Sequence, residues 1–288
     1  MRPAIERRIA VVTGAAGGIG KASARELGRE YDLILTDLLE DRLEQACADL
    51  TDEGYIIVRR VAGDLSEQSV VDELIAAIHS SNQLGALLHA AGVSSGMADW
   101  QTIIRANIVG TRRLLDALEP KLESGFVAVL IASIAGHFAQ RDSEIDALIA
   151  TSHTADFLTR FEPHLRRVAS AVNDASFNYS GLSGPAYGVS KRATLREAAL
   201  RSPVWAEKGA RIVSVSPGLI WTPMGRYEVE HGEAAGDILQ QTPLRRWGTA
   251  MEIAQAVAFL TSGKASFITG TDLRIDGGMV PARLGQDV

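Results

Sequence analysis

The sequence has little cysteine, no long apolar run and no concentrated charge of one sign. Cys47 is the only cysteine among 288 residues, so the chain cannot form an internal disulfide. No apolar run approaches the roughly 18 residues that a membrane-spanning helix needs. The net charge is −6 and no basic block is present, which argues against nucleic acid as a partner. Histidine and cysteine show no metal-ligand spacing, so we expect no metal site.

The sequence also lacks a secretory signal and any visible domain boundary. Arg2, Glu6, Arg7 and Arg8 precede a short apolar run, which is not the pattern of a signal peptide, so we expect a cytoplasmic protein. No internal repeat, low-complexity tract or long linker divides the chain. With 46% hydrophobic residues, the composition favours a single large α/β domain over residues 1–288.

Short strand-like runs alternate with helical patterns along the chain. This alternation is typical of a parallel sheet with helices on both faces, and seven strands fit one doubly wound sheet. The strands are expected at residues 9–12, 33–36, 56–61, 86–90, 126–132, 211–216 and 272–275. The helices are expected near residues 21–31, 40–51, 67–79, 100–122, 187–201 and 250–262.

A glycine-rich turn joins the first expected strand to the first expected helix. The strand leads into the residues Thr13–Gly20, and a helical stretch starts near Lys21. Glycines let the backbone turn tightly and approach a pyrophosphate, while the helix N-terminus supplies amides and a favourable dipole. The turn therefore predicts a dinucleotide site of the Rossmann type. Its cofactor-binding residues are Gly14, Gly17, Gly18, Ile19 and Gly20.

Asp37 ends the second expected strand, 17 residues after Gly20. A carboxylate there can accept hydrogen bonds from an adenosine ribose. It would repel a ribose phosphate, since each unit of like charge at about 4 Å costs roughly 4 kcal/mol at an effective dielectric of 20. Leu38 follows, and the glycine turn holds no Arg or Lys to bind such a phosphate. The sequence therefore predicts NAD as the cofactor, although Asp37 could also be an ordinary helix cap.

Tyr187 and Lys191 lie four positions apart, which places them on one face of a helix. A free tyrosine has a pKa of about 10 and is a poor base at neutral pH. An ammonium about 5 Å away favours the phenolate by roughly 3 kcal/mol at an effective dielectric near 20, which lowers the pKa of the phenol by about two units. The pair is therefore a candidate for general acid–base catalysis.

Together with further motifs in the same order, these features resemble the short-chain dehydrogenase/reductase family over nearly the whole chain. The residues 105–110, 131–136 and 217–223 match its motifs around a catalytic Asn, a catalytic Ser and a loop over the nicotinamide; 242–248 and 266–278 match its C-terminal part. The resemblance implies further cofactor-binding residues: Asp64, Leu65, Ala90, Ala91, Gly92, Tyr187, Lys191, Pro217, Gly218, Ile220 and Thr222.

The resemblance also implies a catalytic role for Asn107, Ser133, Tyr187 and Lys191. Ser133 would hold the substrate oxygen, Tyr187 would transfer the proton, and Lys191 would lower the pKa of the phenol and bind the nicotinamide ribose. Asn107 would hold a relay water. The alternatives are an ordinary turn residue for Ser133, a solvated surface charge for Lys191 and a satisfied buried amide for Asn107.

The sequence departs from the family pattern at three places. His89-Ala90 replaces a usual pair of asparagines, and Val213 stands where many relatives have Asn. Ser133 and Tyr187 are 54 positions apart, more than the family norm, which predicts an insertion within residues 137–184. Its apolar residues recur at helical spacing, and Pro163 and the stretch 173–184 would separate and end the helices. A minority of relatives, including a bacterial 3α-hydroxysteroid dehydrogenase/carbonyl reductase, carry a helical insertion here.

The expected function is an NAD-dependent oxidoreductase that interconverts an alcohol and a ketone. One alternative is an enzyme like the nucleotide-sugar epimerases, whose glycine spacing Gly14, Gly17 and Gly20 also fit; the expected lack of a further substrate domain argues against it. Another is an NAD-binding sensor or scaffold without turnover, although such proteins usually lose the Tyr or the Lys.

The substrate is expected to be uncharged and rather hydrophobic, for example a steroid. The residues that the sequence places near the substrate are mostly apolar, and no Arg or Lys obviously waits for an acidic group. The resemblance implies a homodimer or a homotetramer, and the inserted helices would alter assembly or cover the substrate. The candidate substrate residues are Ile134, His137, Trp221, Met224 and Tyr227.

Overall fold

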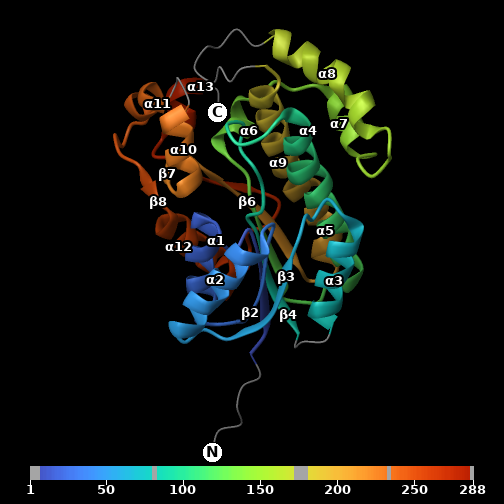
Figure 1. Cartoon of the computed structure of the whole chain (residues 1–288), viewed down its shortest axis with the longest axis vertical. Helices are drawn as coiled ribbons and strands as arrows, with labels where there is room; N and C mark the ends of the chain where they lie inside the picture. The colour runs from blue at the N-terminus through green and yellow to red at the C-terminus, as the bar shows by residue number, and fades with distance from the viewer. Residues whose placement is uncertain (1–6, 80–82, 172–180, 232–234, 286–288) are drawn as a thin grey trace, which may run out of the picture.

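A parallel sheet of seven strands forms the centre of the protein (Figure 1). The computed structural model describes residues 7–79, 83–171, 181–231 and 235–285. The strand order is β3-β2-β1-β4-β5-β6-β9, and every pairing is parallel. All seven strands lie within two residues of their expected positions. They are β1 (Ile9–Thr13), β2 (Asp32–Asp37), β3 (Ile57–Ala62), β4 (Leu84–His89), β5 (Val127–Ile131), β6 (Arg211–Pro217) and β9 (Asp272–Ile275).

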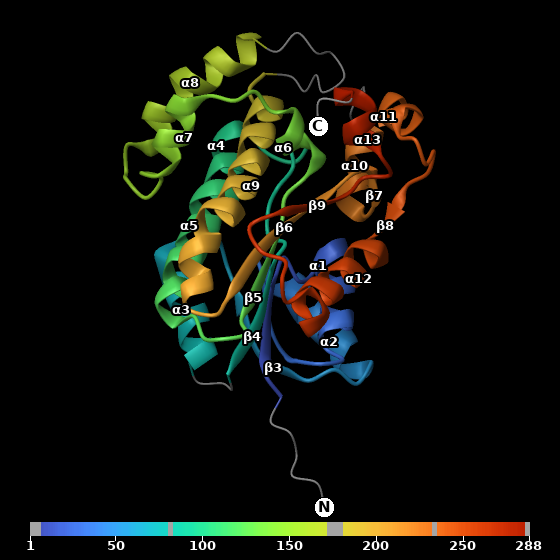
Figure 2. The same cartoon turned by 180° about the vertical axis from the view of Figure 1, so that it is seen from behind.

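Helices cover both faces of the sheet (Figures 1 and 2). One face packs against α1 (Gly18–Leu27), α2 (Glu40–Asp52) and α12 (Ala250–Thr261), and Val12 faces this side. The other face packs against α3 (Gln68–His79), α5 (Thr111–Leu118) and α9 (Ser183–Glu207), and Val11 faces that side. Neighbouring residues of a strand therefore serve two different cores, as the doubly wound fold requires. The expected α/β fold is confirmed.

The helix expected over residues 100–122 is present without a gap over residues 100–121, but it is not a regular α-helix throughout. It consists of α4 (Trp100–Ile104), a π-helical turn (Arg105–Gly110), α5 and a short 3₁₀ turn (Glu119–Lys121). Wider helical turns of this kind occur where a side chain takes part in other bonds, and Asn107 lies inside this one. The π-helical turn therefore marks the position where the hydrogen-bond pattern of the α-helix changes and the Asn107 side chain bonds to the backbone of Val93.

The segment between Ser133 and Tyr187 is helical, as expected, in α6 (Ile134–Phe138), α7 (Ser143–Ile149) and α8 (Phe157–Ala171). The described apolar side chains of these helices form no outward patch. Phe157 and Phe161 are buried in a third core cluster with residues of α4 and α9. Pro163 lies inside α8 and does not end it, contrary to the expected separation. The end of the helices expected at residues 173–184 falls partly on residues 172–180, which lie outside the described residues.

Several short elements surround the carboxyl ends of the strands and were not expected (Figure 2). The two short strands β7 (Ile220–Trp221) and β8 (Gly248–Thr249) pair in parallel. The helices α10 (Pro223–His231), α11 (Ala235–Gln241) and α13 (Met279–Leu284) follow the ends of β7, α10 and β9. Their pattern in the sequence is too short to distinguish them from loops. Among the described residues, no helix has the length and apolar character needed to cross a membrane.

Candidate active site

One cavity of about 570 Å³ lies at the carboxyl ends of the strands. In doubly wound sheets, ligands bind at this edge, where the strand order reverses between β1 and β4. Every expected catalytic or cofactor-binding residue except Asn107 lines it. The expected residues that line the cavity are Gly14, Gly17, Gly18, Ile19, Gly20, Asp37, Asp64, Leu65, Ala90, Ala91, Gly92, Ser133, Tyr187, Lys191, Pro217, Gly218, Ile220 and Thr222.

The glycine turn is packed so tightly that two of its positions exclude a side chain. Gly14 has a φ of +66°, and a Cβ there would lie 2.7 Å from the carbonyl oxygen of Ala90. A Cβ at Gly20 would lie 2.0 Å from the carbonyl oxygen of Gly14. The helix α1 starts directly at the turn, at Gly18, and its first residues line the cavity; the first amides of a helix have no partner within the helix. A pyrophosphate fits such a cradle.

Asp37 is held in place by two backbone amides at the edge of the same cavity. Its Oδ2 accepts a hydrogen bond from the Ala16 amide at 2.9 Å, and its Oδ1 accepts one from the Leu38 amide at 2.9 Å. The carboxylate is thus fixed beside the glycine turn and retains acceptor capacity. Arg42 also lines the cavity, which the sequence reasoning missed because it considered cations only in the turn.

Tyr187 and Lys191 lie on one face of α9, as their spacing predicts. The Lys191 Nζ is 5.7 Å from the centroid of the Tyr187 ring and donates a hydrogen bond to the Ile131 carbonyl at 3.0 Å. Lys191 is buried, which rules out the solvated surface charge. Burial lowers the pKa of its ammonium to about 8, and the nearby Glu228 carboxyl opposes this shift. The ammonium is therefore close to the phenol and, with a pKa of about 8, mostly charged at pH 7.

Ser133 reaches the cavity because α6 packs closely on α9. A Cβ at Gly136 would lie 2.8 Å from the backbone of Lys191, so only glycine permits this approach. Ser133 caps α6, and its Oγ accepts a hydrogen bond from the Ala135 amide at 3.2 Å. An accepting hydroxyl still has its own proton to donate. Ser133 and Tyr187 can therefore both reach an oxygen atom placed in the cavity.

Asn107 is buried beside the cavity and does not line it. Its Oδ1 accepts from the Val93 amide at 2.9 Å, and its Nδ2 donates to the Val93 carbonyl at 2.9 Å. The same Nδ2 donates to the Ser190 Oγ at 3.1 Å. Both amide protons are therefore engaged, which matches the satisfied buried amide rather than a side chain that holds a relay water. These bonds connect the loop after β4 to α9.

His89 forms a continuous chain of hydrogen bonds beneath the cavity. Thr111 Oγ1 donates to the Asn107 carbonyl at 2.8 Å, so it must accept from the His89 Nε2 at 2.8 Å. The Nδ1 then accepts from the Thr13 hydroxyl at 2.8 Å. Complete burial lowers the pKa of His89 to about 3, with the Lys191 ammonium acting in the same direction. His89 is therefore neutral and replaces the amide that the family usually has here.

The expected substrate residues divide into two groups. Ile134, Met224 and Tyr227 line the cavity, whereas His137 and Trp221 do not, so their assignment to the substrate site was wrong. The His137 Nε2 lies 2.9 Å from the Asp272 carboxylate.

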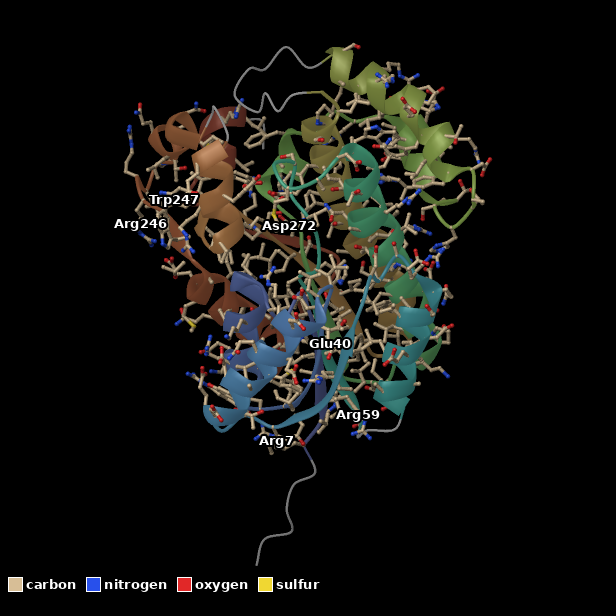
Figure 3. The ribbon with its side chains drawn as sticks, in the orientation of Figure 1. Arg7, Glu40, Arg59, Arg246, Trp247 and Asp272 are labelled. Carbon is tan, nitrogen blue, oxygen red and sulfur yellow. The ribbon has the colours of Figure 1, made fainter. Side chains whose placement is uncertain are left out.

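Trp221 is 53% exposed and meets the ring of Trp247 edge-on, with centroids 5.2 Å apart. Figure 3 shows Trp247 with Arg246 on the outer side of the molecule, whereas Asp272 lies further inside. Trp221, a residue inside a matched motif, thus lies outside the cavity lining.

Glu228 is the cavity residue that sequence reasoning missed most clearly. It comes from α10, directly after Tyr227, and its side chain is half-buried. Burial raises the pKa of its carboxyl, while the Ser94 hydroxyl and the Lys191 ammonium lower it. No motif contains this position. The only signal was that α10 follows the loop expected over the nicotinamide.

Two family models together match almost the whole chain. Residues 8–145 match the model described as short chain dehydrogenase, and residues 144–280 match the one described as enoyl-(acyl carrier protein) reductase. The short-chain dehydrogenase/reductase bsc3 of Alternaria brassicicola is 32% identical over 96% of this chain and 97% of that protein. The cyclohexanol dehydrogenase of Acinetobacter sp. (strain SE19) is 29% identical over 94% of each chain.

A solved structure supports the same relationship. The 3-alpha-hydroxysteroid dehydrogenase from Pseudomonas sp. B-0831, complexed with NADH, superimposes with a TM-score of 0.74. It is 27% identical to this chain, and the match covers 97% of this chain and 99% of that chain.

Proposed function

We propose, from the premise that the chain belongs to the short-chain dehydrogenase/reductase family, that it transfers a hydride between NAD(H) and the carbon of an alcohol or ketone. The observation that carries this proposal is that Ser133, Tyr187 and Lys191 line one cavity with the glycine turn. A cofactor cradle and an acid–base group are thus available to the same bound substrate. This arrangement favours a dehydrogenase over a sensor without turnover.

The residues of the chain hold the substrate and move a proton. Ser133 donates a hydrogen bond to the carbonyl oxygen, and the Tyr187 phenol gives that oxygen its proton in reduction. When bound, the nicotinamide supplies the hydride for reduction and accepts it in oxidation. Hydride and proton together convert C=O to CH–OH, and the reverse reaction returns the proton to the Tyr187 phenolate. The Lys191 ammonium stabilises that phenolate.

Asn107 acts in this proposal as a positioning residue. Its amide fixes the Val93 backbone against Ser190, and the Ser190 Oγ donates to the Tyr187 carbonyl at 2.8 Å. The loop after β4 is thereby connected to the first turns of the helix that carries Tyr187. Loss of the amide would leave buried backbone groups without partners, which costs about 1–3 kcal/mol.

Tyr187→Phe tests the proposed chemistry. This variant should lose turnover by more than about a hundredfold, because it lacks the proton that the alcohol needs, and should bind NADH nearly as well as the parent. Steady-state rates with a panel of cyclic and steroid ketones and NADH titrations by fluorescence measure both quantities. Tyr55→Phe is the matched control, because Tyr55 lies outside the cavity lining and the change keeps the ring that packs on Gly28. Residual activity above about a hundredth of the parent would remove Tyr187 from this role.

NAD is proposed as the cofactor because of the fixed Asp37 carboxylate. It accepts hydrogen bonds from ribose hydroxyls and repels a ribose phosphate. NADH should therefore bind at least about tenfold tighter than NADPH, and Asp37→Ala should narrow this ratio. Asp41→Ala, at an exposed position on α2 outside the cavity lining, should leave it unchanged. Equal or tighter NADPH binding by the parent would show that Arg42 outweighs Asp37.

The substrate proposed is an uncharged, mainly apolar alcohol or ketone. The support comes from Ile134, Met224 and Ile238, which line the cavity with apolar side chains. The names of the cyclohexanol and 3-alpha-hydroxysteroid dehydrogenases agree with this substrate class. We further propose that residues 1–288 form a single domain, that the chain assembles as a homodimer, with a homotetramer as the alternative, and that it acts in the cytoplasm.

A further inference from the structure

Glu228 is an acidic residue in the lining of the cavity. Among the described residues, three acidic ones line the cavity; Asp37 ends β2, and Asp64 follows β3. Glu228 comes instead from α10, and its carboxyl is close enough to Lys191 for each to change the pKa of the other. Glu228 therefore lines the same cavity as Tyr187 and Ser133, the residues proposed to act on the substrate.

Apolar side chains line the cavity together with Glu228. Val93, Met97 and Met224 line the same cavity, and burial raises the pKa of the Glu228 carboxyl. A carboxyl in such surroundings requires a hydrogen-bond partner, because an unsatisfied polar group away from water is costly. The Ser94 hydroxyl is near enough to lower its pKa, yet it makes no hydrogen bond of good geometry.

The helix α10 holds Glu228 over the loop that follows β4. A Cβ at Gly96 would lie 3.5 Å from the ring of Tyr227, the residue beside Glu228, so α10 and this loop are in contact. Ser94 and Ser95 in the loop are buried, and among the described residues neither hydroxyl has a hydrogen-bond partner. The side chains of Glu228, Ser94 and Ser95 therefore offer more hydrogen-bonding groups at this contact than they pair with one another.

We propose that Glu228 determines substrate specificity by accepting a hydrogen bond from a second hydroxyl group, so that the preferred substrates are hydroxyketones and the corresponding diols. The inference rests on the proposed function and refines its substrate class. A carboxylate or phosphate on the substrate would be repelled by Glu228 when the residue is ionised. An ammonium would meet the Lys191 cation nearby, which favours a neutral hydroxyl as the partner.

A series of three related ketones tests this inference: cyclohexanone, 4-hydroxycyclohexanone and 4-oxocyclohexanecarboxylate. The parent should reduce the hydroxyketone with a kcat/KM at least about tenfold above that for cyclohexanone, because a hydrogen bond to a charged group contributes that much. In Glu228→Leu this preference should disappear, since the bond is lost. Glu228→Gln should keep part of it and should accept the carboxylate better than the parent does.

Controls separate this inference from the proposed function. Glu230→Gln changes an exposed residue of the same helix outside the cavity lining and should leave all ratios as in the parent. NADH affinity, measured by fluorescence, should be the same in the parent and all three variants. The affinities of the three ketones for the NADH complex are also measured, because they report recognition without turnover.

Each outcome has a defined meaning. A preference for the hydroxyketone that is equal in the parent and Glu228→Leu overturns the role of Glu228 while turnover still supports the dehydrogenase. Binding that depends on Glu228 without any turnover supports the role of Glu228 and contradicts the proposed function. A parent that neither binds nor reduces 4-hydroxycyclohexanone overturns the inference as stated.

Discussion

At the scale of single residues, His89 stands where the family usually has an asparagine, and neighbouring side chains bond to its ring. The sequence indicated the loss of an amide beside the cofactor at this position. The structure places there a ring whose two nitrogens are both bonded, to Thr13 and Thr111. Thr13 Oγ1 also accepts from the amides of Ala90 and Ala91, at 3.1 and 3.0 Å. The ring therefore supports the end of β4 without needing to contact the cofactor.

His89 should make the fold sensitive to acid. Its pKa is lowered from 6.5 to about 3 in the folded chain, so only the unfolded chain takes up this proton between those values. Stability is thus fully present above pH 6.5 and falls as the pH drops, by about 2 kcal/mol at pH 5.

His89→Asn should be less stable than the parent at pH 7 by about 1–3 kcal/mol, because a shorter amide leaves one threonine unpaired. Between pH 7 and pH 5, however, it should lose about 2 kcal/mol less stability than the parent. Urea unfolding at both pH values measures this difference. Parallel losses in the two proteins would contradict a neutral buried His89.

Residues in motifs could be assigned from the sequence because each motif fixes a local backbone shape. The glycine turn and the Tyr187–Lys191 spacing carry their geometry with them, and these residues do line the cavity. Asn107 could not be placed in this way, since its neighbour Val93 comes from another loop. Glu228 has no local pattern at all. Its role depends on where α10 lies, which is decided by tertiary packing rather than by spacing.

At the scale of elements, α7 and α8 form a layer over α4 and α9 (Figure 2). The apolar spacing of residues 145–172 predicted the helices correctly, yet it could not indicate what they cover. The same pattern would suit an interface with a second chain. In the structure, Ile145, Phe161 and Leu165 are buried within the chain itself, so these side chains do not form the exposed apolar face that such an interface needs. None of their described residues lines the cavity, so they form no lid there.

Phe161→Ala tests this packing. Phe161 is fully buried, and its ring centroid is 5.3 Å from that of Phe157. Removal of a buried phenylalanine side chain should lower the free energy of unfolding by about 3–5 kcal/mol. Arg160→Ala, which removes only an exposed ion pair to Asp156, should lower it by less than about 1 kcal/mol. Urea unfolding compares the two, and similar small losses would mean that α8 is not part of the core.

At the scale of the whole molecule, exposed apolar side chains gather near the β9 edge of the sheet. Leu273 on β9 and Phe267 just before it are both exposed, as is Val204 on α9. The loop between Phe267 and Leu273 lies against α9, because a Cβ at Gly270 would be 2.4 Å from the Ser202 Oγ. A terminal strand also presents unpaired backbone groups. This edge therefore has the properties of an interface between copies of the chain.

We expect a homodimer that uses this edge. Phe267→Ser removes the most exposed of these apolar side chains and should weaken association, whereas its full exposure within one chain means that the free energy of unfolding of the monomer should hardly change. Ile56→Ser is the matched control, since Ile56 is 50% exposed beside β3 at the opposite edge of the sheet. Light scattering from about 1 to 100 μM should show a dimer for the parent and the control, and a shift towards monomer for Phe267→Ser. A parent that remains monomeric, or a Phe267→Ser variant that associates as tightly as the parent, would exclude this edge as the interface.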